Sequence, residues 1–198
     1  MTSTDSAPTT RTDVPTATVP VVVGAVAGLA WAAGFRGWMV ELAGPASQVN
    51  WDTFAAILAP GLLTGAALGW ALHLRRTGGH PRVRWLAAAP LLFAIAPMLL
   101  PGGFVTLVTT GAGSGASWVA LIGLTGGYAL AGRGRRWTRA LAGAVAAVLA
   151  VGLVPIATDV GGPRLALDTP RGIWVAVLGV SFAAVLAIAS AIPHRPAA

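Results

Sequence analysis

The chain has 198 residues, of which 56% are hydrophobic and only 10% are charged, whereas roughly a quarter of the residues of an ordinary soluble domain are charged. This composition excludes a fold whose only solvent is water. Because the chain has no cysteine, disulfides, thiolate metal sites and cysteine nucleophiles are excluded as well. The net charge of +7 arises from 13 arginines without a single lysine.

The first predicted elements are a polar tail and an apolar helix. Residues 1–18 are rich in Thr, Ser and Pro, so burial cannot offset the entropy of ordering them, and we expect a disordered cytoplasmic tail. The apolar run 19–43 predicts the first transmembrane helix. A cleaved signal peptide is the alternative, because Ala30-Trp31-Ala32 is similar to a cleavage site, but the leader is long and weakly basic and the apolar run exceeds a signal peptide's usual length.

Five further apolar stretches complete an all-α bundle of about six transmembrane helices within residues 19–193. They cover residues 51–74, 85–100, 117–131, 137–158 and 172–192. The third and fourth helices are shorter than the ~20 residues needed to cross ~30 Å of hydrocarbon. Between them, residues 101–116 contain an apolar run at 104–108, and the sequence leaves open whether this segment enters the bilayer as a re-entrant excursion covered by protein.

Arginine predicts the orientation of the bundle. The loops after the second and fourth helices hold Arg75, Arg76, Arg82, Arg84, Arg133, Arg135, Arg136 and Arg139. Because basic loops stay in the cytoplasm, the N-terminal tail and the short tail 194–198 are expected there too, in a protein of the cell membrane. This topology accounts for the basic charge without nucleic acid as a partner.

Tryptophan provides an independent indication, because its amphipathic ring favours the headgroup level. Of the eight tryptophans, seven fall at a predicted membrane surface and only Trp31 lies deeper. The seven are Trp70, Trp85 and Trp137 at the inner surface and Trp38, Trp51, Trp118 and Trp174 at the outer surface.

Small residues at regular intervals predict close helix packing. Gly61, Gly65 and Gly69 recur every fourth residue, as do Ala183, Ala187 and Ala191, with a shorter pair at Gly123 and Gly127. Such stripes let membrane helices approach closely. Prolines at positions 60, 90, 97 and 155 are expected to bend or break their helices; broken helices also occur at transport sites, but proline is common in membrane helices generally.

A polar cluster on the outer face is the candidate site. It comprises Arg36, Glu41 and Asp52, joined by Asp159, Arg164, Asp168 and Arg171 from the last outer loop. Arg36 is the most unusual member, because an ionisable group within an apolar helix is a functional candidate by default. The sequence favours a set of surface ion pairs worth ~0 to 1 kcal/mol each, with Arg36 as an interfacial anchor beside Trp38. The alternative is that the cluster binds a lipid headgroup, a small ion or a partner protein.

Motifs for catalysis, metals or cofactors are not predicted. No Ser/His pair, paired aspartates or His-Glu-x-x-His lies within the helices, and His73, His80 and His194 are not spaced for a metal. The glycine-rich run 111–115 lacks the Lys-Ser/Thr ending of a phosphate loop. The interior polar residues are hydroxyls such as Thr64, which disfavours proton-driven transport.

The segment 28–44, GLAWAAGFRGWMVELAG, resembles the first helix of small multi-pass membrane proteins of high-GC actinobacteria. The use of Arg without Lys and the abundance of Ala and Gly fit that source. The resemblance covers mainly this helix and implies no activity, cofactor or binding residue.

The sequence therefore favours a non-enzymatic membrane bundle that acts as a partner or accessory subunit. Besides the lipid bilayer, its expected partner is another membrane protein or a second copy of the chain. A transporter or lipid-handling permease is the alternative and requires a polar cavity between the kinked second, third and fifth helices. An intramembrane enzyme is the third hypothesis and requires the outer charged residues to converge.

Overall fold

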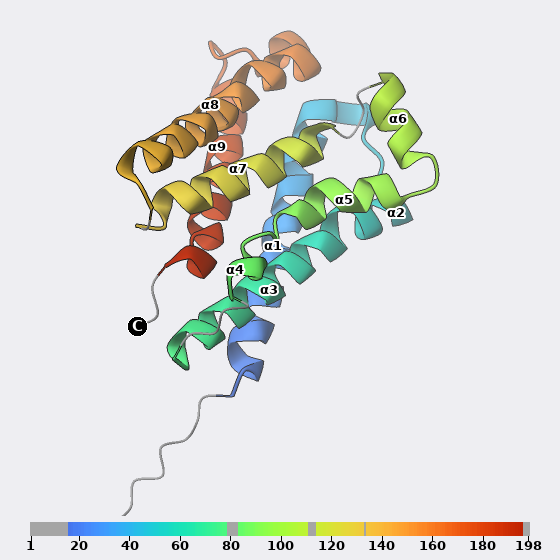
Figure 1. The fold of residues 1–198 in the computed structure, drawn as a ribbon. Helices are drawn as coiled ribbons and strands as arrows, with labels where there is room; N and C mark the ends of the chain where they lie inside the picture. Colours follow the sequence, from blue (N-terminus) through green and yellow to red (C-terminus); the bar gives the residue numbers. More distant parts are fainter. Residues whose placement is uncertain (1–15, 79–82, 111–113, 133, 196–198) are drawn as a thin grey trace, which may run out of the picture.

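The computed structural model describes residues 16–78, 83–110, 114–132 and 134–195, and within them it contains helices and no strand. The predicted tail up to residue 15, His80, Arg82, Arg133 and residues 111–113 and 196–198 lie outside these ranges. The all-α prediction is confirmed. Figure 1 shows long helices crossing one another at oblique angles, with a short upright helix, α6, at one edge.

The helices follow the predicted order. They are α1 (Thr18–Ala43), α2 (Trp51–Thr53), a π-helical segment (Phe54–Leu58), α3 (Ala59–Arg76), α4 (Val83–Leu86), α5 (Leu91–Leu99), α6 (Gly103–Thr110), α7 (Ser114–Leu130), α8 (Arg136–Gly161) and α9 (Pro170–Ser190), with 3-10 turns at Gly44–Ala46, Gly162–Leu165 and Ile192–His194. Except for the third, each predicted helix matches one helix or continuous helical stretch whose ends lie within three residues of the predicted ones.

Four helical stretches of the described chain are long and apolar enough to cross a membrane, and a fifth if the bent pair α5–α6 forms one span. The four are Thr18–Ala43, Trp51–Arg76, Arg136–Leu165 and Pro170–His194. The membrane-type composition of the helices is thereby confirmed. Helix α7 is apolar but shorter than these four, so six crossings stay a prediction.

The predicted third helix over 85–100 is divided at Pro90, one of the prolines at which the sequence predicts a bend or a break. Helix α4 ends at Leu86, turns follow at 87–90, and α5 begins at Leu91. Pro90 explains the interruption, because its ring removes a backbone donor and disfavours helical geometry in the residue before it. The Ala89 carbonyl accepts hydrogen bonds from the Leu92 amide and from the Thr64 hydroxyl of α3. The second bond connects the turn between α4 and α5 to α3.

The other prolines act differently from one another. Pro97 lies in the last turn of α5, and α6 then leaves at 104° to it through Gly102, whose φ is +74°. Pro60 is the second residue of α3 and follows the π-helical segment Phe54–Leu58, whose wider turns accommodate a proline ring better than α-helical turns do. Pro155 lies inside α8 without interrupting it, so the break expected there is absent.

Helices α1 and α3 pack backbone against backbone. Gly61, Gly65 and Gly69 of α3 face Ala32, Gly24 and Pro20 of α1 in antiparallel order. A methyl group added to Gly24 would collide with the Gly65 carbonyl, and one added to Gly65 would collide with the Gly24 carbonyl. Glycine at these positions permits an approach that a side chain would prevent.

Helices α1 and α9 pack through aromatic rings instead. Trp31, Phe35 and Trp38 stack along α1 with ring centroids 5.1 and 5.3 Å apart, and Phe182 of α9 meets the first two edge-on. The Trp31 indole donates to the Phe182 carbonyl at 3.1 Å, and the Trp38 indole to the Val175 carbonyl at 2.8 Å. Each of the two indole rings thus contributes both packing area and a hydrogen bond to α9.

Trp38, which was predicted at the outer membrane surface, has a buried side chain. It is only 5% exposed, and its indole nitrogen donates to a carbonyl of α9 inside the bundle. Trp118 is half-buried against α8 at Gly152. The five tryptophans with exposed side chains are Trp51, Trp70, Trp85, Trp137 and Trp174.

Helices α7 and α9 also meet through small residues. Gly126 and Gly127 of α7 lie against Ala187 and Ser190 of α9, and Ala183, Ala187 and Ala191 are all buried. The Ser190 hydroxyl is buried without a hydrogen-bond partner among the described residues. Small side chains thus set the distance between these helices, as they do between α1 and α3.

Candidate functional site

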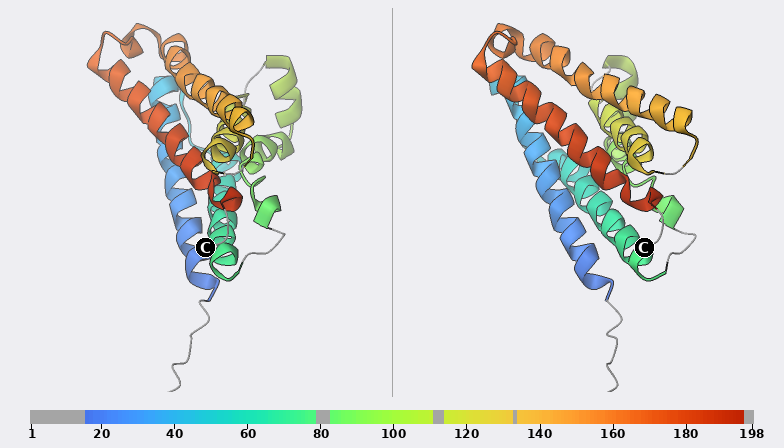
Figure 2. Two further views of the ribbon diagram at one scale, coloured as in Figure 1. Left: turned by 60° about the vertical axis from the view of Figure 1, so that its left-hand side comes forward. Right: turned by 90° about the vertical axis from the view of Figure 1, so that its left-hand side faces the viewer.

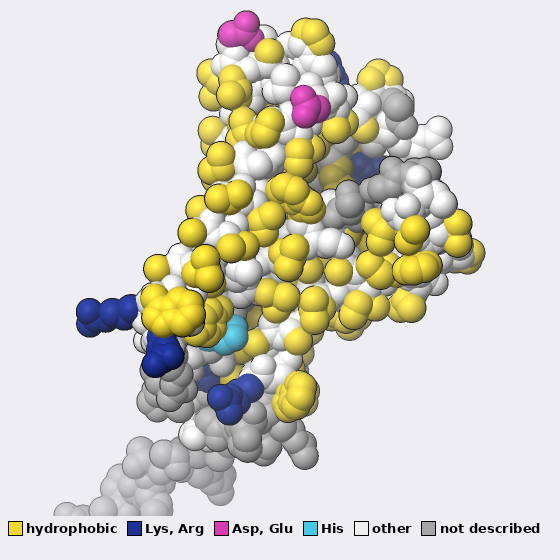
Figure 3. Space-filling view, turned by 45° about the horizontal axis from the view of Figure 1, so that its top comes forward, with side chains coloured by type: hydrophobic (Ala, Val, Ile, Leu, Met, Phe, Trp, Pro, Cys, Tyr) yellow, Lys and Arg dark blue, Asp and Glu magenta, His cyan; other side chains and the backbone are white. Residues whose placement is uncertain are grey.

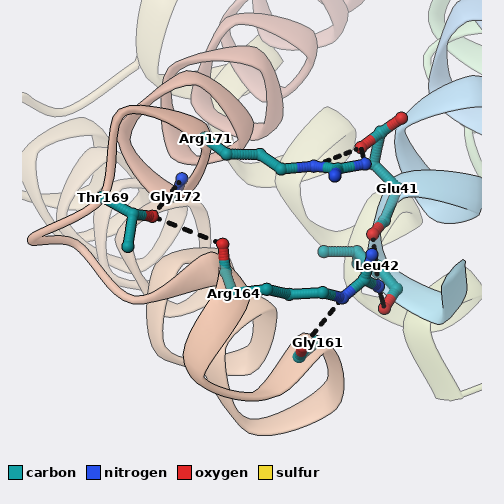
Figure 4. A network of polar contacts seen from close by, with 7 residues as sticks. All are labelled: Glu41, Leu42, Gly161, Arg164, Thr169, Arg171 and Gly172. Atoms are coloured by element: carbon teal, nitrogen blue, oxygen red, sulfur yellow. Dashed lines mark hydrogen bonds and ion pairs between the residues drawn. The ribbon is translucent and has the colours of Figure 1, made fainter.

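Three members of the predicted outer cluster form a network that joins the end of α1 to the loop between α8 and α9 (Figure 4). Arg171, at the start of α9, donates to the Glu41 carboxylate from Nη2 at 2.6 Å and from Nε at 3.1 Å. The two side chains are 56% and 40% exposed. A pair this open to solvent is worth ~0 to 1 kcal/mol.

Arg164 binds backbone rather than carboxylate. Its Nη2 donates to the carbonyls of Glu41 and Leu42, each at 2.9 Å, and its Nε donates to the Gly161 carbonyl at 3.0 Å. Carbonyls in the last turn of a helix lack partners within the helix and attract a cation. A single guanidinium thus satisfies the ends of both α1 and α8, and Gly44 leaves room for it.

Thr169 holds the loop that carries these arginines. Its hydroxyl accepts from the Gly172 amide at 3.0 Å, as the N-cap of α9, and lies 2.8 Å from the Ala166 carbonyl, to which it donates. Pro170 follows in the first helical position, where its missing amide is of no consequence. Hydrogen bonds within the loop therefore hold the start of α9, and the Arg171 side chain extends from there toward Glu41 of α1 (Figure 4).

The remaining members of the predicted cluster lie outside this network. Arg36 donates to the Ser47 hydroxyl at 3.0 Å and to the Gln48 carbonyl at 2.6 Å, so it fastens the loop that follows α1. Asp52, Asp159 and Asp168 are exposed, and none pairs with another described residue. The described residues also contain no group of three or more His, Asp and Glu that could hold a metal ion.

Charge is distributed unequally between the two ends of the bundle. On the face drawn in Figure 3, acidic side chains lie at the upper end and arginine side chains protrude at the lower end. The arginines of the end opposite to Glu41 include Arg76 at the end of α3 and Arg136 at the start of α8. We call this the inner end and the end that contains Glu41 the outer end.

A groove of about 410 Å³ lies between the inner halves of α1, α3 and α9. It extends from Trp31 near the middle of α1 to Val19 at its beginning, and Phe93 of α5 contributes to the wall. Arg76 is the charged residue of its lining. Gly24 and Gly28 of α1 face the glycines of α3 along it, so the residues that bring the two helices together also leave space beside them.

The polar groups inside the groove are engaged elsewhere. The Trp31 indole donates to α9, and the Thr64 hydroxyl donates to the Ala89 carbonyl at 3.1 Å. The remaining wall consists of apolar side chains and glycines, apart from Arg76. This cavity differs from the one that a solute transporter was expected to require, which was polar and lay between the second, third and fifth predicted helices.

Sequence reasoning did not find this groove, although a signal was present. Gly24 and Gly28 of α1 lie four residues apart, as do the glycines of α3. Because the two helices are antiparallel, their glycine faces can lie against each other. The divergence of α9 from α1 beyond Trp31, visible in Figure 2, has no comparable pattern in the sequence. Comparisons with protein-family models, with curated proteins and with solved structures find no match, so the chemistry of this chain has to be argued from its own residues.

Proposed function

We propose that the chain is a non-enzymatic multi-pass protein of the cell membrane that acts by binding, as an accessory or partner subunit. The supporting observation is that the arginines of the outer end bind other groups of the same chain. At the outer end, Arg164 and Arg36 bind carbonyls of the chain itself, and Arg171 pairs with Glu41. In a membrane protein, proton relays and ion sites use ionisable groups in the interior, whereas the buried Thr64 of this chain has a neutral hydroxyl that donates to the Ala89 carbonyl.

The proposed topology has six crossings with both ends in the cytoplasm. It assigns α1, the α2–α3 stretch, α8 and α9 to four crossings, and the α5–α6 pair and α7 to the other two. Helix α7 is short, but α5, α8 and α9 pack around it, so little of its backbone meets lipid. The arginines of the inner end support the cytoplasmic assignment.

Because the chain lacks cysteine, single-cysteine variants test this topology directly. In intact cells, an impermeant maleimide should label Leu167→Cys in the loop before α9, and should label Thr77→Cys after α3 only once the cells are opened. Thr109→Cys at the end of α6 should behave like Leu167→Cys if α5–α6 forms a crossing. The reverse pattern at residues 77 and 167 would contradict the orientation.

The binding role is tested by purification from native membranes through two successive columns. A protein or lipid that remains at constant stoichiometry supports it. A homogeneous chain that carries no partner and no lipid, and whose deletion leaves the composition of other membrane complexes unchanged, would contradict it.

The groove favours lipid handling as a second candidate function. Its apolar wall suits a hydrocarbon chain and not a polar solute. On this alternative, the open side between α1 and α9 is the entry path. Loss of the chain should then change the distribution of a lipid between the two leaflets, whereas an accessory subunit would leave that distribution unaltered.

A further inference from the structure

We propose that the groove between α1, α3 and α9 binds one acyl chain of an anionic phospholipid, with the phosphate held at Arg76. This inference rests on the membrane placement proposed above and on the inner end facing the cytoplasm. It goes beyond that placement, because it assigns a specific ligand class to one site instead of the general contact of a bundle with lipid.

The length of the groove matches one leaflet. Along α1 it extends from Val19 to Trp31, which is about 18 Å at ~1.5 Å per residue. Half of a hydrocarbon core of ~30 Å is about 15 Å. An acyl chain that starts at the inner surface therefore reaches the closed end of the groove, at the aromatic rings of Trp31 and Phe93.

The wall of the groove selects hydrocarbon. Its volume of about 410 Å³ lies within the range of ligand sites, ~300 to 1,000 Å³. The Trp31 indole and the Thr64 hydroxyl already donate to carbonyls, so neither requires a bond from the occupant. A polar ligand would lose its hydration without compensation there, whereas an alkyl chain would not.

The mouth of the groove attracts an anion. Arg76 ends α3 with an exposed side chain, and it forms no ion pair within the described parts of the chain. Helix α1 begins at the same end, whereas α3 and α9 end there, so the helix dipoles oppose one another and the charge of the mouth is that of Arg76. A guanidinium binds phosphate through two parallel hydrogen bonds.

A second cavity differs from the groove in the charge of its wall. It measures about 220 Å³, lies between α7, α8 and α9, and is lined by apolar side chains and glycines such as Gly126, Gly143 and Ala147, with no charged residue in its wall. Any apolar molecule can fill such a space. Of these two cavities in the described part of the chain, the groove at α1 combines an apolar wall with a cation at its end, and this charge favours an anionic lipid as the occupant.

The test uses the full chain in nanodiscs of phosphatidylcholine that contain a trace of photoactivatable phospholipid with a diazirine in its acyl chain. The probe is phosphatidylglycerol in one series and phosphatidylcholine in the other. We expect crosslinks in residues 23–31 of α1 and 64–72 of α3, with phosphatidylglycerol favoured about fivefold, the value that one arginine near an anionic headgroup provides. Arg76→Gln should abolish the preference, and Arg84→Gln, at the same end but outside the groove, should keep it.

Filling the groove tests the wall independently of the charge. Ala27→Phe on α1 and Ala189→Phe on α9 should each remove the groove crosslinks, whereas Ala33→Phe, exposed on α1 outside the groove, should not. The proposal fails if both filled variants keep the crosslinks, if Arg76→Gln leaves the preference unchanged, or if the chain dimerises with the groove protected from both probes. Crosslinks on the exposed Val148 and Val151 of α8 report the membrane placement separately: their presence without groove crosslinks overturns only the lipid site, and their absence overturns the placement.

Discussion

The two ends of α1 are held in different ways. At the outer end, Trp38 and the last carbonyls of α1 bond to α9 and to the loop before it. At the inner end α1 touches α3 through glycine, while α9 has moved away and the groove opens between them (Figure 2). The outer end of α1 is thus held by hydrogen bonds and stacked aromatic rings. At the inner end, glycines let α1 and α3 approach each other closely and leave the groove open beside them.

The largest effect is expected from breaking the glycine contact of the inner end. Gly24→Leu places a side chain where the Gly65 carbonyl lies, and backbone cannot give way as a flexible side chain does, so we expect a loss of more than ~3 kcal/mol, or failure to form the bundle. Thermal unfolding in detergent measures it. Gly37→Leu is the control on the same helix, because a Cβ atom added there has open space around it, with no neighbour within 4 Å. Equal stability of the two variants would show that the α1–α3 contact is not the one described.

A smaller effect is expected at the outer end, where Trp38→Phe keeps a ring but removes the bond to Val175. The loss should be about 1 kcal/mol, the usual value for a polar bond between membrane helices. Trp51→Phe is the matched control, because that ring is 85% exposed, and its stability should change by less than ~0.5 kcal/mol. If Trp38→Phe were as stable as the parent, the indole bond would be dispensable and ring packing alone would hold α9.

Two further variants compare the two arginines of the outer end, Arg164 and Arg171. Arg164→Gln should cost about 1 kcal/mol, because three carbonyls lose a charged donor, and Arg171→Gln less than ~0.5 kcal/mol, because its pair with Glu41 is open to solvent. Unfolding at low and high salt measures both. Salt should reduce the effect of Arg171→Gln more than that of Arg164→Gln. The opposite order would indicate that the ion pair, and not the helix cap, fastens α1 to the last loop.

Hydropathy was sufficient to predict α1, α8 and α9, because each is a continuous apolar helix whose signal lies in its own residues. The sequence predicts a bend or a break at Pro90 and does not decide between them. A proline in a membrane helix can bend it or end it, and the Thr64 hydroxyl that secures the Ala89 carbonyl comes from a different helix. Local patterns thus predict the elements, and contacts between elements decide where they stop.

The candidate site was less predictable than the fold. The sequence indicated that Glu41, Arg164 and Arg171 share the outer end, and they do meet. It gave no sign that Arg164 binds backbone, because the carbonyl of Leu42 lies 122 residues away along the chain and belongs to no side-chain pattern. Arg36 was predicted in the same cluster, but it turns to the loop at Ser47 and Gln48, where hydroxyl and carbonyl acceptors lie nearer than any carboxylate.

The stacked rings of α1 have a consequence for the order of assembly during synthesis. The continuous helical stretch Trp51–Arg76, which ends with α3, is the next long helix after α1, so the hairpin of α1 and α3 can close once these two stretches have been inserted. The acceptors of the Trp38 and Trp31 indoles emerge from the ribosome 137 and 151 residues after their donors. Until α9 has been synthesised, the two indole N–H groups on α1 lack these acceptors, so α1 reaches its final contacts only after α9 has been inserted.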